Sequence, residues 1–317
     1  MKRCVVESVA WDEAKSTGVN ASKSGGPREY FECACVSMHS VAQTNPGVDR
    51  VLVTNIELPR DCKEVLDRDG VRIVNQPFDK FAFSRDVDWH LAYYKLCALQ
   101  AVLDEDTYDE LLMLDTDTWV RKPLDGLFAE ISLGGVGFYD LDARNDNPVM
   151  TKMTQTAQAL GFEVSSATCW GGEAICGSSA ELGSLLDFCE SVQRRMEQFG
   201  VYSDRGDEFL LFAAGAAGLL PAVRRLNPYI ARIWTGRYFT PCEWESKTVL
   251  HLPSEKGYAF PLAFKKIAGG SDLFENSFER LCGLRPSRRP LDIRWLAHGV
   301  LVKAKPPQAT WIDERRN

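Results

Sequence analysis

The sequence has no apolar run long enough to cross a membrane and no block of basic residues. A membrane-spanning helix needs roughly 20 consecutive apolar residues, and the first apolar stretch here is already interrupted at Glu7. We therefore expect no secretory signal, no membrane span and a cytoplasmic location. The net charge of −7 does not provide the positive surface that tight binding to nucleic acid requires, so we expect no nucleic-acid partner.

Ten cysteines are present, yet nothing in the sequence marks the protein as secreted. In the cytosol such residues stay as reduced thiols and do not form disulfides. Cys33 and Cys35 are the closest pair, but they lie in a helical pattern that directs their side chains to different sides of the helix. We therefore expect no metal or redox site at these two residues.

The first half of the chain alternates between strand and helix patterns. We expect strands over residues 3–11, 50–55, 71–76 and 110–114, and helices over 28–43, 60–69 and 88–103. This alternation predicts an α/β fold with a mostly parallel central sheet flanked by helices, of the kind that binds nucleotides. With 317 residues and 45% apolar content, the chain is large enough for one domain of this type.

The second half is less regular. We expect strands over residues 135–140, 169–179 and 247–253, helices over 148–161 and 180–200, and a short apolar helix from Asp207. A Ser/Gly-rich loop over residues 16–27 and a Pro-containing tail over 303–317 have few apolar residues to bury. We therefore expect these two segments to be the most mobile parts of the protein.

Two carboxylates, Asp115 and Asp117, directly follow the apolar run of residues 111–114. A continuous apolar run predicts a strand buried on both faces, and ligands of α/β sheets bind beyond the carboxyl ends of such strands. Two like charges so close repel each other, so a divalent cation is the natural partner of an exposed pair at this point. Asp is also a common loop and capping residue, which leaves a purely structural pair as the alternative.

Two metal-using classes of enzyme place a D-x-D at the end of a strand. In phosphatases of the haloacid-dehalogenase type the first strand ends in D-x-D-x-T, a pattern that Asp115, Asp117 and Thr118 match. Those phosphatases also need a later G-D-x-x-x-D or similar acidic pair, and this chain has Leu211 in place of its last Asp. Several strand and helix patterns precede the motif here, whereas such phosphatases carry it near the start of their domain. This class is therefore the weaker alternative.

The second class of enzyme is indicated by the segment DELLMLDTDTWVRKPLDGLF, residues 109–128. It resembles the D-x-D unit of nucleotide-sugar glycosyltransferases with the GT-A fold, especially the glycogenin-like retaining group. Three later segments follow in the order of that group: WGGEAICGS, GDEFLL and VLHLPSEKGY. Two departures are Asp207-Glu208, where the group has Asp-Gln, and the residues after His251, which differ from its H-x-x-G-x-x-K-P-W pattern.

The resemblance implies a metal-dependent glycosyltransferase of the hexosyltransferase class, which moves a sugar from a nucleotide-diphosphate donor to a hydroxyl group with retention of configuration. A UDP-sugar is favoured over a GDP-sugar as donor, and the acceptor would be a glycan, a protein or a small molecule. One GT-A domain would cover residues 1–302, with a nucleotide-binding half over 1–128 and an acceptor-side half over 129–270. A sugar-nucleotide-binding protein without catalytic activity is the remaining alternative.

The expected metal lies on the donor diphosphate, where a cation stabilises the charge that the leaving group gains. Mn²⁺ or Mg²⁺ prefers oxygen ligands, so Asp117 is a direct ligand, and Asp115 binds the metal or the ribose hydroxyls. His251 is the candidate third ligand because the end of its strand could lie near Asp117; a packed core histidine is the alternative. Lys256 would meet the diphosphate as a point charge.

The other candidate donor contacts precede the D-x-D. Lys95 and Arg85 lie where related enzymes often hold a basic residue against the diphosphate or the base, and solvated surface charges are the alternative. The base itself would lie over Val9, Ala10 and Trp11, because the carboxyl end of the first strand opens into the same crevice.

Two further pairs are candidates for the sugar and the acceptor. Gly171 and Gly172 would let them approach the backbone closely, although a bulge or a tight bend also explains paired glycines. Asp207 and Glu208 begin a helix, where acidic residues are favourable as a cap and in the first turn. An inverting transferase needs a base on the acceptor hydroxyl, and a retaining one needs a group on the other face of the sugar. This acidic pair is the candidate for either role.

Overall fold

The computed structural model describes residues 1–12, 26–141, 148–164, 168–218, 222–235, 244–271, 273 and 275–285. The tail over residues 303–317 and residues 16–25 of the Ser/Gly-rich segment lie outside this part of the chain, so their mobility stays a prediction. Residues 26 and 27, which we assigned to that segment, begin the first helix instead.

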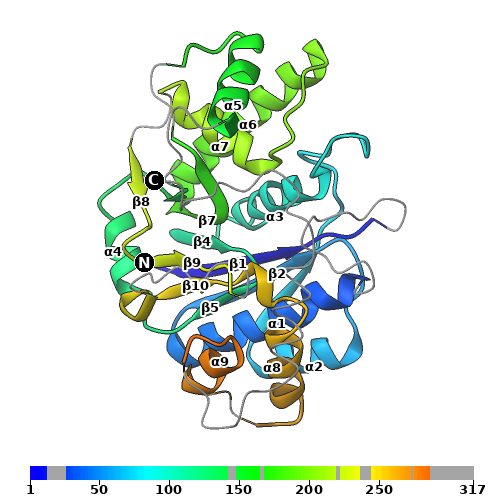
Figure 1. Cartoon of the computed structure of the whole chain (residues 1–317), viewed down its shortest axis with the longest axis vertical. Helices are drawn as coiled ribbons and strands as arrows, with labels where there is room; N and C mark the ends of the chain where they lie inside the picture. Colours follow the sequence, from blue (N-terminus) through cyan, green and yellow to red (C-terminus); the bar gives the residue numbers. More distant parts are fainter. Residues whose placement is uncertain are drawn as a thin grey trace.

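A seven-stranded sheet forms the centre of the molecule, in the order β3-β2-β1-β4-β7-β6-β8 (Figure 1). Its strands are β1 (Arg3–Val9), β2 (Asp49–Thr54), β3 (Val71–Asn75), β4 (Glu110–Leu114), β6 (Val136–Asp140), β7 (Trp170–Ser178) and β8 (Val223–Arg225). Strands β3, β2, β1 and β4 are parallel, whereas β7 is antiparallel to both β4 and β6, and β8 is parallel to β6. The predicted α/β fold with a mostly parallel sheet is confirmed.

Helices cover both faces of this sheet (Figure 1). One face carries α1 (Gly26–Thr44), α2 (Arg60–Arg68), α8 (Ala259–Ala268) and α9 (Glu275–Leu281), and α4 (Asp125–Ile131) adds to the same core. The other face carries α3 (Tyr94–Leu103), α5 (Pro148–Ala159), α6 (Ser179–Phe199) and α7 (Asp207–Ala216). The sheet therefore separates two apolar cores.

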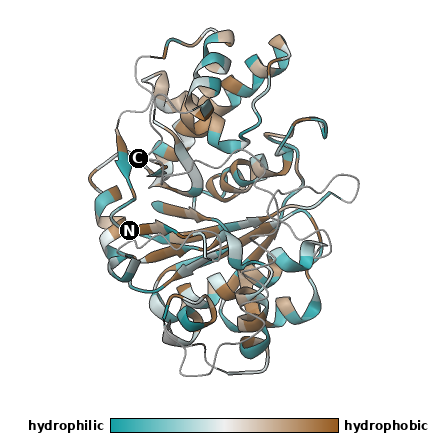
Figure 2. Ribbon diagram, in the orientation of Figure 1, coloured by the Kyte–Doolittle hydropathy of each residue, from teal (hydrophilic) through white to brown (hydrophobic). Residues whose placement is uncertain are grey.

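Strand β4 is buried on both faces, as its apolar run predicts. Leu112 and Leu114 belong to the core beneath α1, while Leu111 and Met113 belong to the core beneath α3. Figure 2 shows the same distribution for the whole sheet: apolar residues are concentrated on the strands and polar residues on the outer surfaces of the helices. Polar residues that follow β4 consequently emerge at the carboxyl edge of the sheet.

A local sequence signal sets the start of α6. The Ser178 side chain accepts a hydrogen bond from the backbone N–H of Glu181, and the Glu181 carboxylate accepts one from the backbone N–H of Ser178. This capping box satisfies donors that a helix leaves unpaired at its first turn. Gly200 ends the helix in the left-handed conformation that glycine adopts most easily.

A second sheet of three strands lies beyond the end of β4. It contains β5 (Thr118–Val120), β10 (Val249–His251) and β9 (Ile230–Arg232), in the order β5-β10-β9. Strand β10 is antiparallel to β5 and parallel to β9. This pairing brings a segment from late in the chain to the D-x-D.

The patterns in the sequence predict neither the strands β8 and β9 nor the helices α8 and α9. Strands of three residues, such as β8 and β9, are too short to show an alternating pattern. The helix predicted over 88–103 begins with a 3₁₀ turn, η1 (His90–Tyr93). The strand predicted over 247–253 ends at His251, before the 3₁₀ turn η3 (Pro253–Glu255).

None of the described helices combines the length and the apolar character that a membrane span requires. The nine cysteines in the described part of the chain are buried and have free thiols. Cys242 lies outside the described residues.

Candidate functional site

The end of β4 places its two aspartates differently. The backbone N–H of Asp115 donates to the carbonyl of Glu173 at 3.0 Å, which extends the pairing of β4 with β7. The side chain of Asp115 is 28% exposed, whereas that of Asp117 is 1% exposed. The expectation of an exposed pair is therefore wrong for Asp117, because β5, which begins at the next residue, is itself buried.

His251 lies beside this pair because of strand register. It is opposite Thr118 in the antiparallel pairing of β10 with β5, and the N–H of Leu252 donates to the carbonyl of Asp117 at 2.9 Å. Nε2 of His251 lies 3.3 Å from Oδ2 of Asp117 and 3.6 Å from Oδ2 of Asp115. Asp115, Asp117 and His251 can each offer a ligand atom, and these atoms all lie within 4.8 Å of one another.

The donor set of this cluster fits a hard divalent cation. Both buried carboxylate oxygens of Asp117 accept no hydrogen bond within the described part of the chain. Buried acceptors are rarely left in this state. Two carboxylates and one imidazole suit Mn²⁺, and Mg²⁺ prefers the carboxylate oxygens. The cluster is therefore a suitable site for such an ion.

Positive charges surround Asp117. Nζ of Lys256 lies 3.2 Å from its Oδ2. Burial alone raises the pKa of Asp117, but the charges of Lys256 and His251 outweigh this effect and hold that pKa well below its usual range. Burial likewise lowers the pKa of His251, while Asp117 and Glu173 raise it to about 9. Asp117 is therefore ionised, and His251 must release a proton when it binds a metal.

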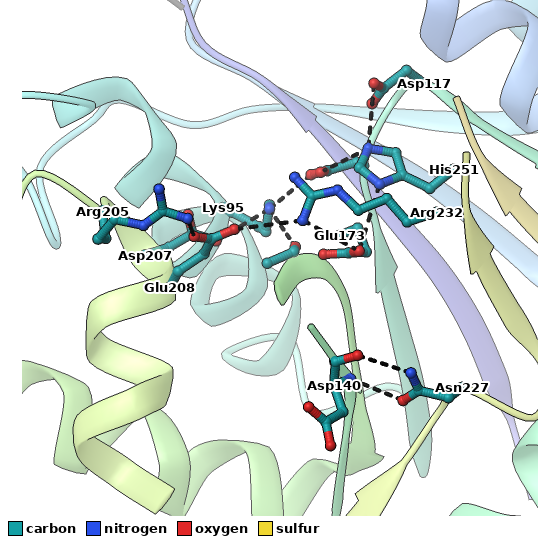
Figure 3. A network of polar contacts seen from close by, with 12 residues as sticks. Lys95, Asp117, Asp140, Glu173, Arg205, Asp207, Glu208, Asn227, Arg232 and His251 are labelled. Carbon is teal, nitrogen blue, oxygen red and sulfur yellow. Dashed lines mark hydrogen bonds and ion pairs between the residues drawn. The ribbon is translucent and has the colours of Figure 1, made fainter. Parts of the chain in front are cut away.

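Glu173 is a buried carboxylate of the site that the sequence analysis did not single out. It lies in β7 at a bulge, where the register with β6 shifts between Phe138 and Tyr139. Its Oε1 lies 3.6 Å from Nδ1 of His251 and 3.7 Å from Nη1 of Arg232 (Figure 3). The available signal was an acidic residue inside the otherwise apolar strand WGGEAIC, since a buried carboxylate needs a partner.

Lys95 of α3 connects the D-x-D to the acidic helix α7. Its Nζ lies 2.7 Å from Oδ1 of Asp115 and 3.1 Å from Oδ2 of Asp207, and it also donates to the carbonyl of Gly172. Burial raises the pKa of Asp207 to about 6, against the opposing charge of Lys95. Lys95 is thus a buried contact of two acids and not a solvated surface charge.

Two glycines make room for the carboxylates. A Cβ on Gly172 would overlap the Asp207 carboxylate and lie 3.1 Å from Nζ of Lys95. A Cβ on Gly171 would overlap the Glu173 carboxylate. Both positions therefore require glycine, because any larger residue would displace the carboxylates of Asp207 or Glu173. Their role in substrate approach stays a prediction.

Glu208 is held by two arginines. It pairs with Arg205, and its Oε1 lies 3.9 Å from Nη1 of Arg232 in β9. Arg232 consequently stands between Glu173 and Glu208, so ion-pair contacts run without a break from His251 to Arg205 (Figure 3). No local pattern in the sequence marks either arginine, because the partners of Arg232 lie on β7 and α7, far away in sequence, and Arg205 precedes α7 as one of many charged residues.

These side chains line a pocket of about 210 Å³. The predicted site residues in its lining are Val9, Ala10, Trp11, Lys95, Asp115, Asp117, Gly172, Asp207, Glu208, His251 and Lys256. Gly171 and Arg85 lie outside the lining, and Arg85 is largely exposed and pairs with Asp12 at 2.6 Å. The contribution of each residue to ligand binding stays a prediction.

No protein-family model matches the sequence, and no curated protein matches it. The fold does match solved structures. Mouse xyloside xylosyltransferase 1 in its apo form has a TM-score of 0.52 at 10% sequence identity, covering 79% of this chain and 97% of that chain. An active-site mutant of LgtC has a TM-score of 0.52 at 14% identity, covering 88% of this chain and 99% of that chain. At these identities the similarity concerns the fold, which is the GT-A fold that the sequence resemblance implied.

Proposed function

We propose that this protein, which has the GT-A fold, is a metal-dependent glycosyltransferase that moves a sugar from a nucleotide-diphosphate donor to a hydroxyl acceptor. The observation that carries the proposal is Asp117, a buried, ionised carboxylate beside Asp115 and His251 that accepts no hydrogen bond from the described residues. The cluster follows β4 at the edge of the sheet where α/β proteins bind ligands. The fold alone would not carry the proposal, because one fold hosts many functions.

Asp115, Asp117 and His251 would hold the metal. A divalent cation bound there supplies positive charge that stabilises the leaving diphosphate. The pocket lining contains five carboxylates and four permanently cationic side chains, so it has no net positive charge even when His251 is protonated. A diphosphate would therefore bind poorly without a cation. This charge balance supports metal-dependent binding, with Lys256 and Lys95 as further contacts.

We infer a UDP-sugar of the hexose class as the donor. The pocket extends to Val9, Ala10 and Trp11 at the end of β1, which supports a base site there. The Asn55 side chain accepts from the N–H of Trp11 at 3.0 Å and donates to its carbonyl at 3.1 Å, so this segment is held in place. The preference for uridine over guanosine rests on the sequence resemblance.

For the transfer step we propose Asp207 and Glu208. Burial places the pKa of Asp207 at about 6, close to the pH at which a general base works well. Lys95 contacts both Asp207 and Asp115, so the acidic helix lies one side chain away from the metal cluster. Either acid could meet the sugar on the face away from the leaving group, and we propose that the reaction retains the configuration of the sugar. The acceptor would be a hydroxyl of a glycan, a protein or a small molecule.

The experiment that tests the function is a thermal-shift panel of UDP- and GDP-sugars with and without Mn²⁺ or Mg²⁺. Ligands that bind the folded state raise the melting temperature by mass action. We expect an increase that requires both nucleotide and metal, followed by release of nucleotide diphosphate in a hydrolysis assay. If no nucleotide stabilises the protein in a metal-dependent manner, the proposal is wrong.

Two other outcomes would identify a different function. A D-x-D-x-T phosphatase would hydrolyse a generic aryl phosphate in the presence of Mg²⁺. A binding protein without activity would show the metal-dependent stabilisation but neither hydrolysis nor transfer. No contact in the described part of the site favours either alternative.

A further inference from the structure

His251 has a carboxylate at each of its two ring nitrogens. Nε2 faces Asp117 at 3.3 Å and Asp115 at 3.6 Å, whereas Nδ1 faces Oε1 of Glu173 at 3.6 Å. The imidazole ring therefore stands between Glu173 and Asp117 (Figure 3). Glu173 can act on an ion at the aspartates through the ring of His251.

The backbone holds Glu173 firmly in this position. It lies in the β7 bulge, and its carbonyl accepts the N–H of Asp115 at 3.0 Å. The regular pairing of β7 with β4 begins at the next residue, Ala174. The side chain is 1% exposed, so solvent does not compensate its charge. Burying a charged side chain costs more free energy than burying an apolar one. A bulge that nevertheless directs a carboxylate toward other acids therefore indicates a function.

Arg232 supplies the compensating charge. It is the neighbour of His251 in the parallel register of β9 with β10, and the N–H of Ile233 donates to the carbonyl of His251 at 2.9 Å. The pairing of β9 with β10 therefore fixes the positions of both the His251 imidazole and the Arg232 guanidinium. Nη1 of Arg232 lies 3.7 Å from Oε1 of Glu173 and 3.9 Å from Oε1 of Glu208.

We propose that Glu173 is a positioning residue of the metal site, which acts through His251. It accepts the Nδ1 proton of the imidazole and thereby directs the lone pair of Nε2 toward the ion held by Asp115 and Asp117. Arg232 holds the Glu173 carboxylate in place with its opposite charge. This inference rests on the proposed function, because it assumes that the cluster holds a metal.

General coordination chemistry supports this arrangement. A histidine that binds a metal commonly donates its other N–H to a carboxylate, and loss of that partner weakens metal affinity about tenfold to a hundredfold. The Nδ1 to Oε1 distance is longer than a hydrogen bond by about half an ångström, which a small rotation of either side chain can close. Glu173 is not itself a member of the ligand cluster.

The experiment is calorimetric titration of Mn²⁺ into the full-length protein at saturating UDP, with Glu173→Gln as the main variant. Glutamine keeps the size of the side chain and removes its charge, so we expect Mn²⁺ affinity to fall about tenfold or more. The matched control is Glu279→Gln. Glu279 is also a fully buried glutamate paired with an arginine, Arg121, but it does not line the pocket. We expect this control to lower the melting temperature and leave Mn²⁺ affinity unchanged.

A second variant keeps the inference testable if Glu173→Gln does not fold. Arg232→Lys retains a positive charge but loses the planar guanidinium, so we expect a smaller loss of Mn²⁺ affinity with the same sign. Unchanged affinity in folded Glu173→Gln, unchanged affinity in Arg232→Lys if Glu173→Gln does not fold, or an equal loss in Glu279→Gln would each overturn the positioning role.

Asp117→Asn separates this inference from the function on which it rests. If Asp117→Asn loses Mn²⁺ affinity and Glu173→Gln does not, the positioning role is wrong and the metal site stands. If Asp117→Asn itself binds Mn²⁺ as well as the unmodified protein does, the metal site is wrong and both proposals fail.

Discussion

The two ends of strand β5 carry two buried clusters of charge that differ in how they are satisfied. Asp117 precedes the strand and belongs to the pocket cluster, defined here as Asp115, Asp117, Glu173, His251 and Lys256. Arg121 follows the strand and belongs to the C-terminal cluster, defined as Arg121, Glu279 and Arg285.

The C-terminal cluster is saturated with hydrogen bonds. Nε of Arg121 donates to Oε1 of Glu279 at 2.6 Å, and Arg285 donates to the other oxygen. Nη1 of Arg121 donates to the carbonyls of Trp244, Glu245 and Lys247. Both oxygens of the buried Glu279 carboxylate thus accept a hydrogen bond from an arginine. Such a network is typical of a structural role, in which the pair holds α9 and the segment around Trp244 against β5.

The pocket cluster contains similar groups without this saturation. Both oxygens of Asp117 and Oε1 of Glu173 accept no hydrogen bond from the described residues, although cations lie 3.2 to 3.7 Å away. Burial is comparable in the two clusters, so burial does not distinguish a structural from a functional site. The two clusters differ in their carboxylate acceptors, which meet cations in the pocket cluster but accept no hydrogen bond within the part of the chain that the structure describes, and such acceptors suit a bound ion.

The largest expected effect is that of Asp117→Asn on activity. Loss of a direct ligand should reduce metal-dependent transfer or donor hydrolysis by at least about a hundredfold. Because Lys256 and His251 lose a buried partner, we also expect the metal-free protein to lose a few kcal/mol of stability, on the order of 3. Activity assays and urea unfolding measure both effects, with Asp67→Asn as an exposed control. Full activity in Asp117→Asn would contradict the proposed function.

The second effect concerns the C-terminal cluster. Arg121→Met removes one of the two arginines that pair with the buried Glu279 carboxylate and leaves Arg285 as the other. We therefore expect the free energy of unfolding to fall by about 3 kcal/mol. Mn²⁺ affinity should not change, because Arg121 does not line the pocket. Replacing both partners, as in Arg121→Met with Glu279→Leu, should recover part of the stability. A loss of Mn²⁺ affinity in Arg121→Met would mean that the two clusters are coupled through β5.

The third effect depends on pH and concerns Glu255, a buried acid that precedes Lys256 of the pocket cluster in sequence. Its carboxylate accepts a hydrogen bond from the Thr235 hydroxyl. Burial raises the pKa of Glu255 from 4.5 to about 7. A raised folded-state pKa contributes stability that is fully present below pH 4.5 and lost as the pH rises through 7.

Glu255→Gln removes this titration. Relative to the unmodified protein, the variant should gain stability between pH 5 and pH 8, by at most about 3 kcal/mol. Urea unfolding of both proteins at the two pH values measures this difference in stability. The contributions of the other titrating groups cancel, because both proteins contain them. A constant difference across the range would show that Glu255 is ionised throughout.

The smallest effect is expected at the surface. Arg60 and Glu64 form an ion pair in α2 at 2.9 Å, with side chains 92% and 64% exposed. Glu64→Ala should change the free energy of unfolding by less than about 0.5 kcal/mol, because water and salt screen such pairs. Unfolding in urea at low and high salt provides the baseline against which the changes at buried charges are judged. If Glu64→Ala lowers the free energy of unfolding by more than about 1 kcal/mol, a difference larger than the fitting error, this exposed ion pair is not a valid reference for the buried charges.

The sequence alone determined the parts of the protein that depend on local patterns. The apolar run of residues 111–114 identified a strand buried on both faces, and the polar residues after it marked the edge at which α/β sheets generally bind ligands. The alternation of strand and helix in the first half predicted the parallel part of the sheet. Asp115 and Asp117 followed from these two facts, because they are adjacent to the strand in sequence.

The tertiary structure alone decided which distant residues join them. His251 meets Asp117 through the register of β10 with β5, Glu173 points to His251 because β7 has a bulge, and Arg121 meets Glu279 across 158 residues of sequence. Periodicity reports the face on which a side chain lies, since it depends on neighbours a few residues away. Strand order and register depend on packing between segments far apart in the chain, so no local pattern contains them.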